Sequence, residues 1–444
     1  MPEVKGQHAV VAGASMAGLL AARVLSGHFD RVTVLERDAV VDDAVARKGQ
    51  PHARHVHALL AQGFRIFERF FPNLRDDLRD GGAILGDMGA DVRWHAYGGY
   101  RRQFESGMTG ALASRPFLEA CVRRRVQALP NVTIRGLADV DEPVASADRA
   151  RITGLQLKPR NGAAAEVITA DLVVDATGRG SATPRWMEAL GYARPDESAV
   201  KINMGYSTRI FRRRAGDLAG AKLVLISPRL PDLARSGYVF PIEGDRWIVT
   251  LGGWGGDYPP TDEQGFLDHA RSLAAPDVFE ILQRLEPQGD IIQHRLPSNL
   301  RRHYETLERW PERYLVLGDA VSSFNPVYAQ GMTSAAMQAV VLDDVLRERT
   351  RAGLDGLRQR YFSRVAKVVD RPWLLAVSED FRATTTTGPK PRGTDLVNPY
   401  VARVHRATQV DAEVHRAFLD VMNLVKPATS LMRPDIAWRV LRAS

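Results

Sequence analysis

Residues His8 to Glu36 read HAVVAGASMAGLLAARVLSGHFDRVTVLE, and the order of patterns in this stretch decides the fold. The segment HAVVAG is short, apolar and ended by a glycine, which predicts a buried strand. A helical pattern, GLLAARVLSG, follows, and RVTVLE then predicts a second strand. Gly13, Ser15 and Gly18 occupy the positions of a dinucleotide-binding fingerprint, and Glu36 stands about twenty residues later, where an acid holds a ribose. The stretch therefore predicts a βαβ unit that binds a dinucleotide.

The turn between the first strand and the helix is expected to hold a pyrophosphate. Gly13 permits the tight turn, and Gly18 lets the helix pack closely against the sheet. Ser15 replaces the usual middle glycine and is small enough to keep the backbone approachable. Met16 and Ala17 lie at the predicted helix N-terminus, where free N–H groups and the positive end of the helix dipole attract an anion.

The composition is that of a globular protein with more than one structural unit. The chain has 444 residues, of which 45% are hydrophobic and 25% charged, and its single Cys121 excludes an internal disulfide and a cysteine-based metal site. No window holds the run of about eighteen apolar residues that a transmembrane segment needs, and the expected location is the cytoplasm. The net charge of +8 would attract anions. The arginine runs lack interleaved aromatics, so no nucleic-acid partner is expected.

Four segments together resemble the group A flavoprotein monooxygenase superfamily, which shares the fold of p-hydroxybenzoate hydroxylase. They are GASMAG with LER, ASRPFLEACV at 113–122, DLVVDATGRGS at 171–181 and GDAVSSFNPVYAQGM at 318–332. The resemblance implies that FAD is the cofactor. It implies that Arg115 contacts the flavin, that Asp175 and Gly178 lie near the pyrophosphate, and that Gly318 and Asp319 hold the ribityl chain.

The resemblance also implies an α/β fold in three parts. A glutathione-reductase-type FAD-binding Rossmann domain would comprise residues 1–75, 101–181 and 301–345. A substrate-binding domain built on an antiparallel sheet would be interleaved with it, at residues 76–100 and 182–300. A helical C-terminal region would span 346–444, interrupted at 384–398 by TTTTGPKPRGTDLVN, whose composition predicts a loop.

Within the superfamily, RKGQPHARHVHALL at 47–60, DATGRGS and GDAVSSFNPVYAQGM look like the bacterial olefin epoxidases of polyether pathways, which are distant relatives of squalene epoxidase. The implied reaction is epoxidation of an alkene in a polyketide or terpenoid-like intermediate through a flavin C4a-hydroperoxide. NADPH, NADH or a separate reductase would supply electrons, and the partners would be an apolar small molecule, O2 and a reductase or carrier protein. Alternatives are hydroxylation of an aromatic substrate and a non-redox cyclase that keeps FAD as a scaffold. No side chain is nominated as an acid–base catalyst.

Three other activities occur on this fold. A flavin-dependent halogenase would show a Trp-x-Trp-x-Ile-Pro segment and a pocket lysine, which this sequence lacks. A geranylgeranyl-type reductase would consume NADPH without O2. A lipid carrier would have lost FAD, and the intact motifs argue against that reading.

The segment YLVLGDAVSSFNPVYAQGM predicts the part of the site that faces the flavin ring. Asp319 ends a buried strand and can accept hydrogen bonds from sugar-chain hydroxyl groups. Pro326 offers a rigid wall without an N–H group. Gly331 and Met332 open the next helix, so that its dipole would stabilise the flavin edge that becomes negative on reduction.

Several basic residues follow the second predicted strand. Arg37 lies near the adenosine or is an ordinary solvated arginine, and Lys48 or Arg54 is expected near the polar edge of the flavin. The nearby histidines His52, His55 and His57 lack the i, i+4 spacing and the carboxylate of a helical metal site, so no metal is expected.

The middle of the chain predicts antiparallel strands, including a hairpin in YVFPIEGDRWIVTLGG around Glu243 to Asp245. Aromatic and apolar residues on these strands are weak candidates for a substrate pocket, because such residues more often belong to a core. The candidates are Trp94, Tyr97, Met204, Tyr238, Phe240 and Trp247.

Overall fold

A five-stranded parallel sheet forms one half of the molecule. The computed structural model describes residues 6–41, 43–159, 164–348 and 353–443. The strand order is β17-β11-β1-β2-β7, with bounds Tyr314–Val316, Leu172–Asp175, Gly6–Ala12, Phe29–Leu35 and Val132–Arg135. The predicted βαβ unit is present, because β1 pairs in parallel with β2 and helix α1 (Met16–Leu25) connects them. The fully buried β1 residues Val10 and Val11 match a sheet that is covered on both faces.

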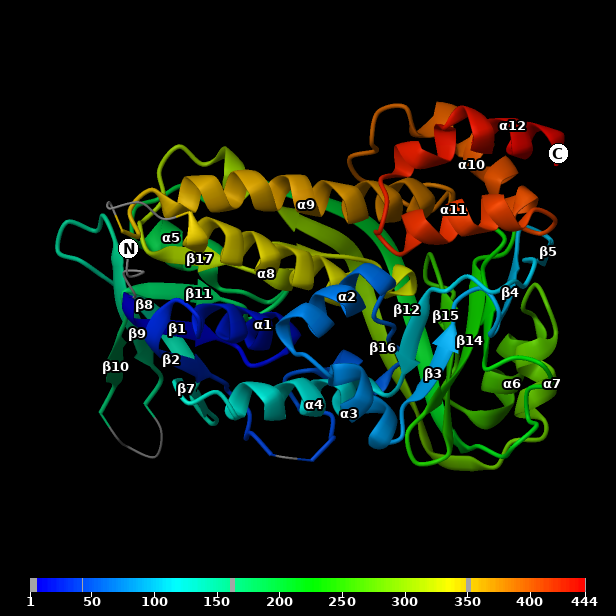
Figure 1. The fold of residues 1–444 in the computed structure, drawn as a ribbon, viewed down its shortest axis with the longest axis horizontal. Coiled ribbons are helices and arrows are strands. Elements are labelled where there is room, and N and C mark those ends of the chain that lie inside the picture. The colour runs from blue at the N-terminus through cyan, green and yellow to red at the C-terminus, as the bar shows by residue number, and fades with distance from the viewer. Residues whose placement is uncertain (1–5, 42, 160–163, 349–352, 444) are drawn as a thin grey trace.

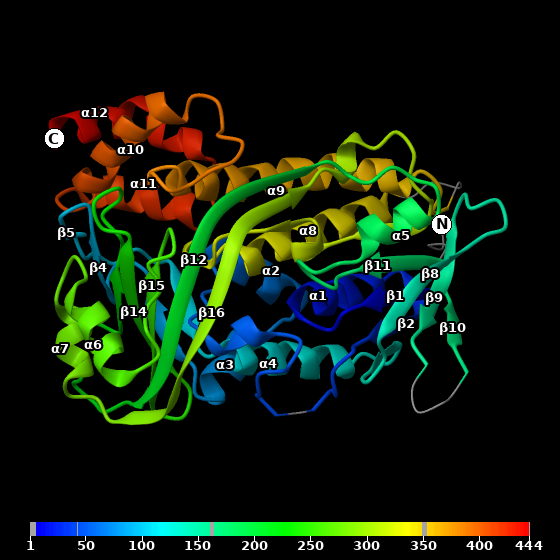
Figure 2. The same cartoon turned by 180° about the vertical axis from the view of Figure 1, so that it is seen from behind.

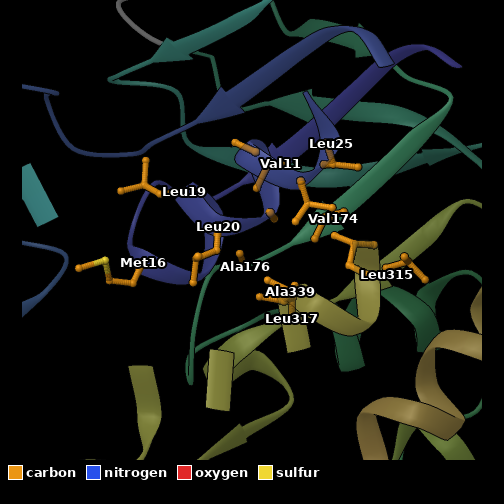
Figure 3. Packing of buried hydrophobic residues seen from close by; sticks show 14 of the residues in the cluster. Val11, Met16, Leu19, Leu20, Leu25, Val174, Ala176, Leu315, Leu317 and Ala339 are labelled. Atoms are coloured by element: carbon orange, nitrogen blue, oxygen red, sulfur yellow. The ribbon is translucent and has the colours of Figure 1, made fainter. Parts of the chain in front are cut away.

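Helices pack against the parallel sheet, and the helices and the sheet together enclose a hydrophobic core. Helix α1 contacts α4 (Arg115–Gln127) and α8 (Gly331–Arg347), and α8 contacts α2 (Ala61–Phe70) and the long α9 (Leu357–Asp380). Figure 3 shows Leu20 of α1, Val174 of β11, Leu317 after β17 and Ala339 of α8 in one apolar cluster. Segments far apart in the sequence therefore meet at the β1–α1 turn.

The other half of the molecule is an eight-stranded sheet with the order β18-β16-β12-β15-β14-β13-β4-β5. Its long strands β12 (Glu197–Arg212) and β16 (Pro287–Arg302) pair in antiparallel fashion and run side by side along the molecule (Figure 2). The predicted hairpin is formed by β14 (Arg235–Ile242) and β15 (Arg246–Gly253). The remaining strands are β4 (Val92–Ala96), β5 (Gly99–Tyr100), β13 (Leu223–Ile226) and β18 (Ser322–Ser323).

Smaller elements complete the two halves. Strands β8 (Val140–Ala145), β9 (Ile152–Leu157) and β10 (Glu166–Thr169) form a three-stranded sheet, and β3 (Ile84–Asp87) pairs with β6 (Thr109–Leu112). Helices α3 (Leu74–Asp80) and α5 (Thr183–Ala189) belong to the half that holds the parallel sheet (Figure 1). Helices α6 (Glu263–Arg271) and α7 (Asp277–Leu282) cover one face of the eight-stranded sheet.

The C-terminal helices lie beyond the far end of α9. They are α10 (Thr394–Ala407), α11 (Ala412–Met422) and α12 (Pro434–Arg442), and they cluster at one corner of the molecule (Figure 1). The loop predicted at 384–398 is shorter than expected, because α10 begins at Thr394, directly after Gly393 in the left-handed conformation. No helix within the described ranges combines the length and the apolar character that crossing a bilayer demands. The predicted fold class, a Rossmann-type parallel sheet with an antiparallel sheet and C-terminal helices, is confirmed.

Candidate functional site

The β1–α1 turn is shaped by two glycines that no larger residue could replace without movement. Gly13 has a φ of +99°, and a Cβ atom there would lie 2.6 Å from the backbone oxygen of Ala176. A Cβ atom at Gly18 would lie 1.7 Å from the backbone oxygen of Gly13. Ser15 is the N-cap of α1, but its side chain makes no capping bond. The first N–H groups of α1 therefore remain available to a ligand.

Glu36 fixes this turn from the end of β2. Its carboxylate accepts hydrogen bonds from the backbone N–H groups of Ala14 (3.0 Å) and Asp38 (3.1 Å). Arg47 Nη1 lies 2.5 Å from the same carboxylate, and both side chains are buried. Three donors thus hold Glu36 in place, which leaves room for about one more hydrogen bond, such as one from a ribose hydroxyl.

A buried ion network surrounds the N-terminus of α1. The Glu119 carboxylate on α4 contacts Arg47, Arg115 at 2.9 Å and Arg123 at 3.7 Å, and Arg47 also contacts Glu36. Burial raises the pKa of Glu119, but Arg115 and Arg47 outweigh it and the pKa is lowered overall. The buried guanidinium groups of Arg47 and Arg115 therefore lie beside the N-terminus of α1, where positive charge suits an anionic ligand such as a pyrophosphate.

Ser15 and Arg115 belong to the same network. Ser15 Oγ donates to Glu119 Oε2 at 3.2 Å and accepts from Arg115 Nη2 at 3.0 Å. Arg115 Nη1 lies close to Glu119 but out of alignment for a hydrogen bond, so this buried N–H group has no hydrogen-bond partner among the described residues. The structure thus brings together four predicted site residues: Gly13, Ser15, Glu36 and Arg115.

The connection from β17 to α8 closes against α1. Gly318 has a φ of +75°, and a Cβ atom there would lie 2.6 Å from Cβ of Ala17. A Cβ atom at Gly331, the first residue of α8, would lie 3.7 Å from Asp319 Oδ1. Asp319 therefore lies between the N-termini of α1 and α8, two helix ends that both favour negative charge.

The Asp319 carboxylate is the group in this connection best placed to bind a ligand. Within the described residues, its carboxylate makes no hydrogen bond. Burial raises the pKa of Asp319 to about 6, although Arg179 and Arg115 act to lower it. Gln330, the residue before α8, is buried, and neither its side-chain amide oxygen nor its nitrogen bonds a residue in the described ranges. Unpaired buried groups of this kind are costly unless a ligand satisfies them.

Asp175 and Gly178 lie beside the turn in the connection after β11. The fully buried Asp175 carboxylate accepts hydrogen bonds from Thr177, through its N–H and hydroxyl groups, and from the hydroxyl groups of Ser181 and Thr183. This carboxylate holds its own loop together. Gly178 has a φ of +82°, with open space around its Cα.

Arg179, which sequence reasoning missed, follows directly in the same DATGRGS motif. Its guanidinium donates to Ser323 at 2.5 Å and to Ser298 at 2.8 Å, and thereby links this loop to the eight-stranded sheet. Burial lowers the pKa of Arg179, and the nearby Asp319 opposes that effect.

The segment with Pro326 is held by a buried acid on another element. Pro326 is half-buried and begins a short 3-10 helix, η4 (Pro326–Tyr328), and Met332 follows in the first turn of α8. Asp380, the last residue of α9, accepts hydrogen bonds from Asn325 (2.8 Å) and Tyr328 (2.8 Å). The position of this segment therefore depends on a residue some fifty positions later in the chain.

Three predicted basic residues do not join the buried network. The side chains of Arg37, Lys48 and Arg54 are exposed, and Arg37 donates to the backbone oxygen of Gly49. The residue that enters the network is their neighbour Arg47, which is 8% exposed. The surrounding sequence RKGQPHARH does not predict the burial of Arg47, because no periodic pattern marks a buried side in that loop.

Comparison with known proteins places the chain in a family. The chain is 35% identical to Protein Rv3254 of Mycobacterium tuberculosis over 399 residues, which cover 87% of this chain and 82% of that protein. It belongs to the Rv3254 family. No family model matches the Rv3254-family chain.

Solved structures share the fold of this Rv3254-family chain at low identity. A flavoprotein/dehydrogenase of Cytophaga hutchinsonii matches with a TM-score of 0.70 and 13% identity, over 99% of this chain and 98% of that one. PqsL, a probable FAD-dependent monooxygenase from Pseudomonas aeruginosa, matches with a TM-score of 0.62 and 18% identity, over 85% and 98%. The flavin-dependent brominase Bmp2 matches with a TM-score of 0.61 and 12% identity, over 98% and 93%. The fold expected from the resemblance to flavoprotein monooxygenases is therefore confirmed.

The Rv3254-family chain has an apolar cluster on the face of the eight-stranded sheet that is turned away from α6 and α7. Phe240 belongs to it with Ile248, and Tyr238 packs against it. Burial raises the pKa of Tyr238 to about 12, and the nearby Ser236 hydroxyl group opposes the rise. Met204 lies in an adjoining cluster together with Val327, from the segment that contains Pro326.

Of the other three pocket candidates, Trp94 also packs against this apolar cluster, whereas Trp247 and Tyr97 lie elsewhere. Trp247 lies in the core between the sheet and helices α6 and α7, on the opposite face from Phe240, because successive side chains of a strand alternate. Trp94 Nε1 donates to Ser227, and its ring contacts Phe418 of α11. Tyr97 stacks on His405 of α10 with ring centroids 4.1 Å apart. Trp94 and Tyr97 thus join the sheet to the C-terminal helices.

Four histidines gather where the loop before α2 crosses the eight-stranded sheet. His52, His55 and His57 come from the loop, and His294 comes from β16. Burial, with neighbouring positive or histidine groups, lowers the pKa of His52 to about 4 and that of His55 to about 3. Among the residues described, no group of three or more His, Cys, Asp or Glu side chains is arranged to hold a metal ion.

Proposed function

We propose that this protein is an FAD-dependent monooxygenase that epoxidises an alkene in an apolar natural-product intermediate. The observation that carries the proposal is Asp319, a half-buried carboxylate between the N-termini of α1 and α8 that makes no hydrogen bond to a described residue. A polyhydroxylated chain such as the ribityl group of FAD would satisfy it. The fold, shared with flavoproteins such as PqsL and Bmp2, supports the same cofactor.

The residues around Asp319 fit the rest of FAD. Glu36 would bind the adenosine ribose, and the N-terminus of α1 at Ser15 would bind the pyrophosphate, next to Arg115. Pro326 and Met332 would border the flavin ring. Asp175 and Gly178 would shape the loop beside the pyrophosphate.

When bound and reduced by NADPH, NADH or a separate reductase, FAD would supply O2 activation and transfer of one oxygen atom. The chain would exclude water and orient the alkene. The N–H groups at the start of α8 would stabilise negative charge on the adjacent ring edge.

The apolar cluster around Phe240 supports an apolar substrate. Its members Phe240, Ile242 and Ile248 present no hydrogen-bonding side-chain atoms, and the cluster reaches the loop before α2 through Val56 and Ala58. Epoxidation rather than aromatic hydroxylation rests on the resemblance to olefin epoxidases in residues 47–60, 175–181 and 318–332.

Oxygen uptake with a substrate panel tests the proposal. The yellow protein is supplied with NADPH, a flavin reductase and ¹⁸O2, together with polyene, terpenoid and phenolic compounds. We expect uptake that depends on an alkene and an epoxide that carries one ¹⁸O atom. Phenol hydroxylation alone would favour the aromatic hydroxylase, and an isomerised product without uptake would indicate the non-redox cyclase.

A further inference from the structure

The cluster of four histidines has more hydrogen-bonding capacity than the protein uses. His55 Nδ1 pairs with Thr208 Oγ1 at 2.7 Å, and His57 Nδ1 pairs with the backbone oxygen of His55 at 3.0 Å. His52 and His294 make no side-chain hydrogen bond to any described residue. Their ring centroids lie 6.4 Å apart and their planes are inclined by 58°. This is too far for the rings to bond each other at about 2.9 Å, but close enough for both to reach one oxygen atom between them.

The histidine cluster lies between the proposed flavin site and the apolar cluster. On one side, His57 lines a small cavity together with Arg115 and Met332. On the other side, the N–H group of Val56 donates to Thr250, and Val56 packs against the apolar cluster that contains Phe240. A substrate lying along the apolar cluster with its alkene toward the flavin would therefore pass the imidazoles.

The imidazoles suit a neutral polar group. Burial lowers the pKa of both His52 and His294, and for His52 the positive charge of Arg115 adds to the effect. Each ring therefore stays neutral near pH 7, with one nitrogen that donates and one that accepts. A hydroxyl group, which also donates and accepts, complements a pair of neutral rings. A carboxylate can only accept, and a hydrocarbon can do neither.

We propose that His52 and His294 bind a hydroxyl group of the substrate, so that the protein acts on alkene-bearing alcohols in preference to hydrocarbons or carboxylic acids. The inference rests on the proposed function for the position of the alkene. The binding of the hydroxyl group itself does not depend on turnover, and it can be tested separately.

Equilibrium binding to the oxidised yellow protein under anaerobic conditions provides the test. The probes are farnesol, farnesoic acid and the corresponding triene that lacks the oxygen. Binding is followed by the flavin absorbance and by the ring ¹⁵N signals of histidine-labelled protein. We expect farnesol to bind about tenfold more tightly than the triene, which corresponds to one or two hydrogen bonds, and to shift the signals of His52 and His294.

Variants assign the effect to the two rings. His52→Phe and His294→Phe should each remove most of the preference for farnesol and leave binding of the triene within about twofold, because only the hydrogen bond is lost. Compared with His294→Phe, His294→Gln should keep part of the preference for farnesol, because the Gln amide can still form a hydrogen bond. His303→Phe is the control, because that ring already pairs with Ser198 and Glu305.

The remaining outcomes would overturn the inference. They are equal binding of farnesol and the triene, binding of neither, tighter binding of farnesoic acid, and histidine signals that respond to added FAD in flavin-free protein but not to farnesol. Failure of oxygen uptake would contradict the proposed function, and the binding result would stand on its own.

Discussion

The hydroxyl group of Tyr328 donates a 2.8 Å hydrogen bond to Oδ1 of Asp380 and so ties the segment before α8 to the end of α9. Asp380 is fully buried, and its carboxylate also accepts from Asn299, Asn325 and, at 3.5 Å, Trp254. Burial raises its pKa to about 6, and these hydrogen bonds oppose the rise. One carboxylate thus joins the eight-stranded sheet, the segment that contains Pro326 and the end of α9.

Asp380→Ala should therefore destabilise the protein and weaken FAD binding together. Removing the carboxylate leaves several buried donors unpaired, which we expect to lower the free energy of unfolding by about 3 kcal/mol. Urea unfolding and fluorescence titration with FAD measure the two effects. Asp370→Ala on the same helix is the matched control, because that carboxylate is 60% exposed and its ion pair with Arg301 contributes about 1 kcal/mol or less. Equal losses in the two variants would contradict the assigned role.

Asp319→Ala should lose bound FAD while the protein stays folded. The variant removes an acceptor of charge-assisted hydrogen bonds, so FAD should bind at least about tenfold more weakly. The ratio of flavin to protein absorbance after purification measures the loss. Asp395→Ala serves as the control, because that side chain is 80% exposed. A fully yellow and active Asp319→Ala protein would place the cofactor elsewhere.

Gly13→Ala and Gly180→Ala make a matched pair within the nucleotide-binding region. A Cβ atom at Gly13 would collide with the backbone oxygen of Ala176, and its φ of +99° disfavours any side chain, whereas Gly180 has nothing within 4 Å of such an atom. We expect Gly13→Ala to lower the melting temperature and to abolish FAD binding, and Gly180→Ala to do neither. Thermal unfolding with and without FAD measures both effects, the change in melting temperature and the loss of FAD binding, in each variant.

Glu119→Gln should have opposite effects on flavin-free stability and on FAD affinity. The change leaves the guanidinium groups of Arg47, Arg115 and Arg123 less compensated, so the free energy of unfolding should fall by about 3 kcal/mol without FAD. The added positive potential should tighten binding of the pyrophosphate. Urea unfolding at several FAD concentrations measures both effects. A loss that FAD does not reduce would show that the pyrophosphate lies away from this network.

Acid should destabilise the flavin-free protein between about pH 6.5 and 4. The pKa values of His52, His55 and His415 are lowered, to about 4, 3 and 4, chiefly by burial, so the unfolded chain takes up protons in this range while the native rings do not. The raised pKa values of Asp319 and Asp380, both about 6, act in the opposite direction. The pKa values of His57 and His405 are lowered as well, so the histidines outnumber the two acids and the equilibrium constant for unfolding should rise by at least about tenfold per pH unit as the pH falls. Urea midpoints that stay constant or increase from pH 6.5 to 4.5 would refute this balance.

Local patterns in the sequence predicted the elements around the site. The βαβ unit at 8–36 and the strand, loop and helix around Gly318 and Gly331 each follow from glycines and short apolar runs that act over a few residues. The loop at 384–398 was predicted too long, because its last five residues carry no signal that distinguishes a first helical turn from a loop.

Such local patterns cannot predict contacts between residues that lie far apart in the sequence. Glu119 meets Arg47 across 72 residues, and Asp380 meets Asn325 across 55, so no spacing rule could pair them. Trp247 and Phe240 were placed together because both are aromatic, but they lie on opposite faces of their sheet. The boundaries proposed for the three parts of the chain stay predictions.

The place of β17 at the edge of the parallel sheet bears on how the chain folds as it is made. β17 pairs with β11, and α8 then packs against α1, so the parallel sheet is completed only by residues that leave the ribosome after every strand of the eight-stranded sheet except β18. Until then, β11 presents an unpaired edge to other nascent chains. Any fragment that ends before Tyr314 would carry that edge permanently, and we expect such fragments to aggregate rather than fold.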